Sequence, residues 1–276
     1  MSVLVLNEPF CSLWQGCDAF EAVDALHGEV FRELEGRRTL RTVVEGRAYF
    51  VKIHHGIGWR EILKNLLSGR LPVLGAANEW KAIARLEQLG VATLSVAAYG
   101  ERGCNPARRH SFIVTNELAP AISLEDYCRD WVQRPPQPAL KRALIRQVAR
   151  IARRMHEGGM NHRDFYLCHF LLHLDPVPSP TALRVSLIDL HRSQVRARTP
   201  RRWRDKDLAA LYFSALDIGL TRRDLLRFVR QYFPGSLRLT LKTEAALLHR
   251  LRVEAERLEM RYLRKYALRQ QARDVQ

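Results

Sequence analysis

Lysine is scarce in this sequence: seven of its 45 basic residues are lysine and 38 are arginine. Acidic residues are also few, because 29 Asp and Glu leave a formal net charge of +16. Guanidinium groups bind phosphate and carboxylate oxygens in a bidentate fork, whereas ammonium groups act as point charges. The composition therefore predicts an anionic partner, which is nucleic acid, an acidic membrane surface, a phosphorylated substrate or an acidic protein. Charge alone does not choose among these.

Other features are missing as well. No window of about 18 consecutive apolar residues occurs, which argues against a helix that spans a bilayer. The five cysteines include no CxxC pair, so the sequence predicts a reducing compartment such as the cytoplasm. The opening MSVLVLNEPF has no cationic segment before its apolar run, unlike a secretory signal. Without a Cys pair or an HExxH motif, a zinc cluster is also disfavoured for the histidines at positions 162, 169, 173 and 191.

The hydrophobic pattern changes along the chain. Residues 28–54 contain three short β-type runs separated by Gly-containing turns, which indicate an antiparallel meander. A helix is expected over 78–89 and another strand pair over 93–101 and 111–115. Apolar residues then recur at three- and four-residue intervals over 138–157, as in a long amphipathic helix.

This change predicts an α+β protein with two lobes. The expected division is a sheet-containing first lobe over 1–116, a hinge over 117–120 and a helical second lobe over 121–276. Near the end of the chain an apolar stripe, with arginines around the rest of the helix, predicts a basic amphipathic helix. This helix either only docks its stripe on the core or has an added role at an anionic surface; the stripe consists of Leu251, Ala255, Leu258, Tyr262 and Tyr266.

Three segments carry residues with obvious chemistry. Lys52 lies inside the strand YFVKI, Asp164 follows a His-Arg pair at the start of a loop, and Asp189 ends the strand RVSLID. In this order they resemble the catalytic set of the protein-kinase-like fold. The resemblance implies that Lys52 binds the α- and β-phosphates of ATP, that Asp164 accepts the proton of the attacking hydroxyl, and that Asp189 holds Mg²⁺.

Further parts of the site follow from spacing and from the same resemblance. On the helix over 78–89, Glu79 shares a face with Ile83 and Leu86, so a buried ion pair with Lys52 is expected. The strand that ends at 116 resembles the one leading to the kinase hinge, which implies that backbone groups of Glu117 and Leu118 bind adenine.

The phosphate-binding turn and the catalytic loop depart from the general kinase pattern. The glycine-rich loop is reduced to Gly36, followed by Arg37 and Arg38, whose guanidinium groups replace part of the missing backbone approach to phosphate. His169 stands where kinases carry a second metal-ligating Asn, and because imidazole suits Mg²⁺ less well than oxygen, it is either a metal ligand or a contact to phosphate or substrate. The number of metal ions is left open.

Supporting and docking residues complete the expected site. His162 and Arg163 support the loop, and Asp207 resembles the helix Asp that braces the loop backbone. A basic surface is expected to dock an anionic substrate; its members are Arg192, Arg196, Arg198, Arg201 and Arg202.

Longer strings extend the resemblance from about residue 8 to 235. ELEGRRTLRT, YFVKIHHGIGW, NHRDFYLCHFLLH and LIDLHR are closely similar to the bacterial lipopolysaccharide core heptose(I) kinases of the Kdo/WaaP type. The family implies ATP-dependent phosphorylation of the first heptose of the inner core at its 4-hydroxyl, on a Kdo-bearing lipid A precursor. It also implies work on the cytoplasmic side of the inner membrane.

Several alternatives stay open. The same machinery also serves protein kinases and small-molecule kinases, although kinases of cationic drugs need an acidic acceptor cleft and this chain is basic. An Arg-rich nucleic-acid-binding protein without catalysis would not require Lys52, Glu79, Asp164 and Asp189 in kinase order, so no nucleic acid is expected. The positive charge also suggests attachment to anionic lipid, or an acidic partner such as acyl carrier protein.

Overall fold

The structure is a computed structural model that describes residues 2–34, 36–67 and 74–274. Glu35, which precedes the expected phosphate-binding turn, lies outside the described residues. The chain divides into two compact units. The first comprises Met1–Ala119 together with Asp189–Gln194, and the second comprises Pro120–Ile188 and Val195–Gln276.

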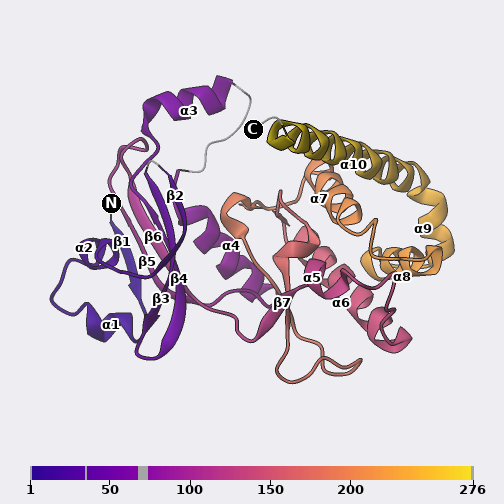
Figure 1. The fold of residues 1–276 in the computed structure, drawn as a ribbon, viewed down its shortest axis with the longest axis horizontal. Helices are drawn as coiled ribbons and strands as arrows, with labels where there is room; N and C mark the ends of the chain where they lie inside the picture. Colours follow the sequence, from indigo (N-terminus) through magenta and orange to yellow (C-terminus); the bar gives the residue numbers. More distant parts are fainter. Residues whose placement is uncertain (1, 35, 68–73, 275–276) are drawn as a thin grey trace. The chain divides into compact units, whose positions relative to one another are not determined.

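The first unit contains a six-stranded antiparallel sheet in the order β1-β5-β6-β4-β3-β2 (Figure 1). The expected meander over 28–54 is β2, β3 and β4, and the expected strand pair is β5 and β6. The strands are β1 (Val3–Leu6), β2 (Glu29–Leu34), β3 (Arg37–Val44), β4 (Arg47–His54), β5 (Val96–Arg102) and β6 (His110–Asn116).

Helices and a 3₁₀ turn complete the described part of the first unit. The apolar core includes Phe10 and Trp14 from around α1, Phe20 and Val23 from α2, and the inward-facing residues of the sheet. In Figure 1, α4 lies on the other side of this sheet. The elements are α1 (Phe10–Leu13), α2 (Ala19–Asp24), α3 (Gly58–Leu67), α4 (Ala77–Gln88) and η2 (Leu190–Arg192).

The second unit is mainly helical. Helix α6 packs on α8, helix α7 packs on α10, and a three-stranded sheet has the order β10-β9-β7. Its elements are β7 (Ala121–Ser123), α5 (Leu124–Cys128), α6 (Pro138–Glu157), β8 (Met160–Asn161), η1 (Leu167–His169), β9 (Phe170–His173), β10 (Val185–Leu187), α7 (Arg201–Phe213), α8 (Arg222–Tyr232), α9 (Leu237–Thr243) and α10 (Ala245–Asp274); β11 (Gln194–Val195) lies where the chain re-enters this unit. The α+β fold class expected from the sequence, with an antiparallel sheet and a helical half, is confirmed.

The apolar stripe of α10 departs from expectation. Ala255 is fully buried and Leu251 and Leu258 are half-buried, but Tyr262 and Tyr266 are 60% and 54% exposed. The expectation that the whole stripe docks on the core is therefore wrong for its second half. None of the helices in the described part of the chain is both long and apolar enough to cross a bilayer.

Candidate functional site

The side chains of strand β4 alternate between the apolar core and the opposite face, which carries Lys52. Tyr49, Val51 and Ile53 are buried in the core, and side chains alternate along a strand, so Lys52 points to the opposite face. His54 shares that face, and burial lowers its pKa to about 3. The imidazole is therefore neutral near pH 7 and adds no positive charge beside Lys52.

Lys52 is held by a buried carboxylate on α4. The Lys52 Nζ lies 2.7 and 3.0 Å from the two Oε atoms of Glu79. Glu79 is only 1% exposed and shares the buried face of its helix with Ile83 and Leu86. A buried carboxylate without a cation would be strongly destabilising, so the pair fixes both side chains. The ion pair expected from helix spacing is confirmed.

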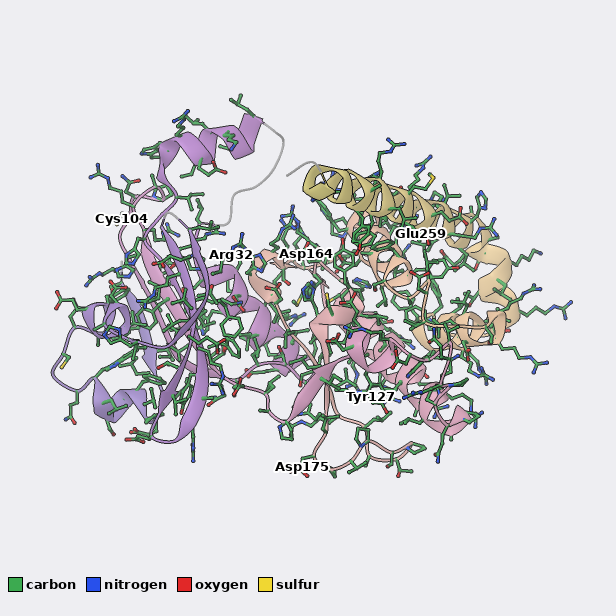
Figure 2. All side chains as sticks on the ribbon, in the orientation of Figure 1. Arg32, Cys104, Tyr127, Asp164, Asp175 and Glu259 are labelled. Carbon is green, nitrogen blue, oxygen red and sulfur yellow. The ribbon has the colours of Figure 1, made fainter. Side chains whose placement is uncertain are left out.

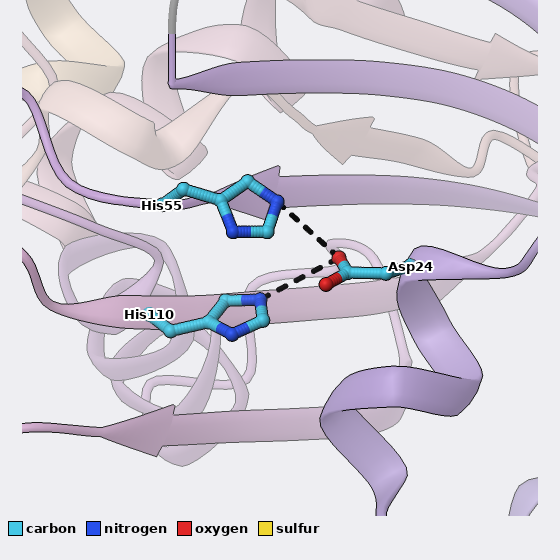
Figure 3. A group of neighbouring side chains, drawn as sticks. All are labelled: Asp24, His55 and His110. Carbon is cyan, nitrogen blue, oxygen red and sulfur yellow. Dashed lines mark ion pairs between the residues drawn. The ribbon is translucent and has the colours of Figure 1, made fainter.

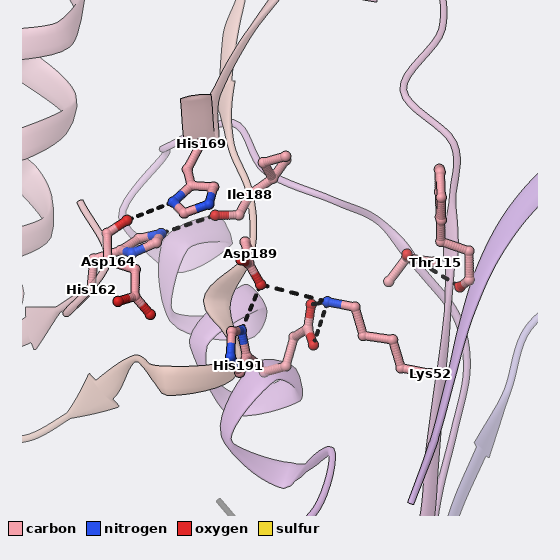
Figure 4. A network of polar contacts seen from close by, with 10 residues as sticks. Lys52, Thr115, His162, Asp164, His169, Ile188, Asp189 and His191 are labelled. Atoms are coloured by element: carbon pink, nitrogen blue, oxygen red, sulfur yellow. Dashed lines mark hydrogen bonds and ion pairs between the residues drawn. The ribbon is translucent and has the colours of Figure 1, made fainter. Parts of the chain in front are cut away.

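Asp189 lies next to this pair, within the same unit. Its Oδ1 is 3.9 Å from Lys52 Nζ and 2.5 Å from His191 Nδ1 (Figure 4). The residue has a left-handed backbone, with φ of 58°, and it is the N-cap of η2, which packs against α4. The Asp189 side chain is 34% exposed, so it keeps access to solvent while facing an ammonium group. A carboxylate in this position can hold a divalent cation.

Glu117, directly after β6, forms an ion pair with Arg41 of β3 that the sequence pattern did not suggest. The Nε and Nη2 of Arg41 each donate to the Glu117 carboxylate at 2.8 Å, and this hydrogen bonding lowers the Glu117 pKa. The Glu117 N–H donates to the Ala48 carbonyl at 3.0 Å, so its carbonyl is the backbone group that it can offer to adenine. The adenine-binding role of Glu117 and Leu118 stays a prediction.

Gly36 occupies a turn that requires glycine. Its φ is +73°, and a Cβ there would lie 2.3 Å from the Gly56 carbonyl oxygen. The His55 N–H donates to the Gly36 carbonyl at 2.9 Å, which ties the turn to the end of β4. Arg37 begins β3, and the Arg38 guanidinium contacts the Asp24 carbonyl at 3.4 Å. Phosphate binding by this turn stays a prediction.

In the second unit, Asp207 anchors the loop that carries Asp164. Its carboxylate accepts the backbone N–H of His162 at 2.7 Å and that of Arg163 at 2.8 Å. Asp207 is 1% exposed and lies on α7. Bonds from N–H groups to a carboxylate are stronger than neutral ones, so they hold the loop, including Arg163 with its positive φ of 77°. This contact is the bracing expected from the sequence.

Two residues behind Asp207 were missed by sequence reasoning. The His156 Nε2 lies 3.3 Å from Asp207 Oδ2, and its Nδ1 lies 2.8 Å from the Tyr232 hydroxyl. Both side chains are buried, and burial raises the pKa of the Tyr232 phenol. They come from the end of α6 and the end of α8, so only the packing of these helices brings them together. No local motif would have identified them.

The two loop histidines are oriented by backbone carbonyls. His162 Nε2 lies 2.9 Å from the carbonyl oxygen of Ile188, and His169 Nδ1 lies 2.6 Å from that of Asp164 (Figure 4). Because a carbonyl oxygen only accepts, the ring nitrogen that faces it carries the N–H in each histidine. His169 thus supports the backbone of Asp164 itself, a contact that sequence reasoning did not foresee.

The arginines expected to dock substrate do not behave as one set. Arg192 belongs to the first unit and the other four to the second. Arg196 donates to the Asn161 Oδ1 at 2.6 Å, so one of its hydrogen-bond donors is used to hold β8. Arg198, Arg201 and Arg202 are exposed, and the Arg202 guanidinium lies 5.1 Å from the Trp203 ring centroid. Their docking role stays a prediction.

The second unit also contains a partly open apolar cavity of about 500 Å³. Helices α6, α7 and α8 supply most of its wall, for example Val148, Leu211 and Leu225, and Arg222 and Arg252 also line it. A cavity of this size and composition fits an apolar ligand of moderate length. Nothing in the sequence pattern separated these residues from ordinary core positions.

Comparison with known proteins identifies relatives of this chain. A sequence model of the "Lipopolysaccharide kinase (Kdo/WaaP) family" matches residues 21–232. The chain is 64% identical over 255 residues to the lipopolysaccharide core heptose(I) kinase WaaP of Pseudomonas aeruginosa, covering 92% of this chain and 95% of the relative. It is 55% identical over 260 residues to the protein of the same name from Escherichia coli K12, covering 94% and 98% respectively.

A solved structure described as WaaP in complex with acyl carrier protein is also similar. Its TM-score is 0.83 at 59% sequence identity, and the match covers 93% of this chain and 99% of that one.

Proposed function

Because the chain belongs to the lipopolysaccharide kinase (Kdo/WaaP) family, and is therefore a phosphotransferase, we propose that it transfers the γ-phosphoryl group of ATP to the first heptose of the lipopolysaccharide inner core, at its 4-hydroxyl. The main support is the Lys52 amine, held 2.7 Å from the buried Glu79 and facing Asp189. Phosphoryl transfer needs this positioning of charge more than it needs covalent chemistry.

Each half of the chain has its own task in this proposal. In the first unit, Lys52 binds the α- and β-phosphates, the Gly36 turn covers them, and the hinge backbone binds adenine. In the second unit, Asp164 accepts the proton of the acceptor hydroxyl. In the second unit, His162 of the catalytic loop hydrogen-bonds to the carbonyl of Ile188, and the next residue of the chain is Asp189.

The donor set of the first unit fits Mg²⁺. Asp189 offers carboxylate oxygens, which are the ligands that Mg²⁺ prefers, and Lys52 lies close enough to share the phosphates with the metal. When bound, Mg²⁺ neutralises charge on the phosphate oxygens. His169 is the weaker candidate ligand, because its ring is a nitrogen donor and its Nδ1 is already engaged with the Asp164 carbonyl.

The direct test is phosphate transfer to a defined acceptor. We expect the protein, given ATP and Mg²⁺, to add one phosphate to dephosphorylated core oligosaccharide on a Kdo-lipid A precursor, and ³¹P–¹H correlation to assign it to the 4-hydroxyl of heptose I. Transfer to a protein or small-molecule acceptor instead, or salt-sensitive binding of nucleic acid without transfer, would overturn the proposal.

We also propose that an acyl carrier protein is a partner. The support is the solved relative described as a complex with acyl carrier protein, the net charge of +16, and the apolar cavity of the second unit. A carrier protein is acidic, and its acyl chain is an apolar ligand that suits the cavity.

If the acyl chain enters this cavity, acylated carrier protein should bind more tightly than unacylated carrier protein. Ala215→Phe fills the cavity from α7's C-terminal side and should weaken binding of acyl carrier protein at least about tenfold, because the acyl chain loses its apolar site. Ala182→Phe, in an exposed loop of the same unit, should leave the affinity for acyl carrier protein, measured by titration calorimetry, unchanged. Equal binding of both carrier forms would argue against the cavity as the acyl site.

Finally, we propose peripheral attachment to an anionic membrane surface on the cytoplasmic side. The C-terminal half of α10 exposes Tyr262, Leu263 and Tyr266 beside Arg257, Arg261 and Arg264. Each arginine near such a surface contributes about 1 kcal/mol. Neutralising all three should lower co-sedimentation with phosphatidylglycerol vesicles on the order of 100-fold, whereas neutralising three exposed arginines on α6 and α8 (Arg146, Arg150 and Arg223) should have little effect. Equal losses would point to net charge rather than to α10.

A further inference from the structure

Three potential metal ligands meet at one end of the first unit's sheet. Asp24 is the last residue of α2, His55 follows β4, and His110 begins β6 (Figure 3). Strands β4 and β6 are neighbours, with His54 paired to Ser111, so the antiparallel register brings His55 opposite His110. The residues are 31 and 55 positions apart along the chain, and only the fold brings them together. None of them belongs to the kinase site.

The two imidazoles point at the same carboxylate oxygen. The Oδ1 of Asp24 lies 3.3 Å from the Nε2 of His55 and 3.5 Å from the Nε2 of His110. Asp24 Oδ1 and His110 Nε2 are buried atoms, and within the described structure neither has a hydrogen-bond partner. Polar atoms that are buried together without a hydrogen bond indicate a missing partner that would satisfy them.

The spacing matches the ligand shell of a tetrahedral metal. Zinc bonds of about 2.0–2.2 Å place neighbouring ligand atoms about 3.3–3.6 Å apart. The two measured separations fall in this range, and all three ligand atoms lie within 4.8 Å of one another. Two imidazole nitrogens disfavour Mg²⁺ and Ca²⁺, which prefer oxygen, and favour a borderline ion.

We infer that Asp24, His55 and His110 form a Zn²⁺ site with a fourth position open to water. The site is separate from the ATP machinery and joins α2 to the ends of β4 and β6. His55 also donates its backbone N–H to Gly36, so an ion at this position would support the Gly36 turn from behind.

Neighbouring charges are compatible with a cation. Arg102 forms a 2.6 Å ion pair with Asp18 and lies over the Phe20 ring. Arg38 also lies nearby, and its guanidinium contacts the backbone carbonyl of Asp24 at 3.4 Å. Phe20 in turn packs against the His110 ring, with centroids 5.1 Å apart, and shields that side from water. The Asp24 carboxylate therefore faces the two imidazoles, whereas Arg102 is paired with Asp18.

The test uses Zn²⁺ alone, without nucleotide, so its outcome does not depend on kinase activity. Chelator-treated full-length protein should bind one equivalent of Zn²⁺ in competition with a chromophoric chelator. Co²⁺ should give the intense visible absorption of a tetrahedral complex. Zn²⁺ should also raise the thermal unfolding midpoint, because it binds the folded state.

Two ligand variants and one control make the test specific. His55→Ala and Asp24→Asn should each weaken Zn²⁺ binding at least about 100-fold, since losing a ligand costs more than losing an outer-shell partner. His55 is 49% exposed, so its removal disturbs little packing, and circular dichroism verifies the fold. His27→Ala, an exposed histidine three residues from Asp24, should bind zinc like the parent. Unchanged Zn²⁺ binding in His55→Ala, or none in the parent, would overturn the site.

Discussion

Asp164→Asn is expected to lower the turnover number for phosphate transfer by about 10²–10⁴-fold, the usual contribution of a general base. The amide has nearly the shape of the carboxylate but cannot accept the acceptor's proton. Its backbone carbonyl still receives the His169 ring, so the loop keeps its conformation. The affinity for ATP should stay close to that of the parent, because nucleotide contacts are assigned to Lys52 and its neighbours.

Single-turnover kinetics and ATP binding measured on the same preparation separate these two effects. Asp175→Asn is the matched control, since Asp175 lies in an exposed loop of the same unit (Figure 2). It should transfer phosphate at the parent rate. Full transfer by Asp164→Asn would remove this residue from the mechanism, and loss of ATP binding would indicate a wider structural defect.

Asp207→Ala is expected to have the largest effect on stability, lowering the free energy of unfolding of the second unit by about 3–5 kcal/mol. The substitution removes the acceptor of the buried His162 N–H, at about 1–3 kcal/mol, and that of the partly buried Arg163 N–H. It also removes the contact of Asp207 with His156. Transfer activity should fall with it, because the loop that carries Asp164 loses its anchor.

Urea unfolding followed by circular dichroism measures this loss. Asp205→Asn is a demanding control, because Asp205 lies two residues earlier on α7 and pairs with Arg204 in a partly exposed site. Such a surface pair contributes about 0–1 kcal/mol, so its loss should be small. A similar destabilisation by both variants would mean that the two N–H bonds to Asp207 do not anchor the loop.

Local patterns were sufficient for the elements and for the chemistry-bearing residues. The helix over 138–157 was placed with the bounds that α6 has, because its apolar spacing continues from the proline at its start to the glycines at its end. The Glu79 face of α4 was identified in the same way, and burial against the sheet followed from its apolar neighbours. Periodicity predicts which side of an element turns inward, and that was all these conclusions required.

Contacts between distant segments were beyond such reasoning. The Arg41–Glu117 pair, the Tyr232–His156–Asp207 chain and the bond of Arg196 to Asn161 each join residues at least 35 positions apart. For the second half of the α10 stripe, the sequence predicted burial that the structure does not have. An apolar stripe indicates which side chains can be buried, but not whether a neighbouring element covers them.

The amino-acid order by itself determined the family, the α+β class and the candidate site residues, because motifs and hydrophobic periodicities can be read from the sequence alone. The tertiary structure alone decided which side chains satisfy Asp207, which carbonyls orient the two loop histidines, and that Asp24 meets His55 and His110. Strand register and helix packing determine these contacts, and neither can be predicted from the spacing of residues along the chain.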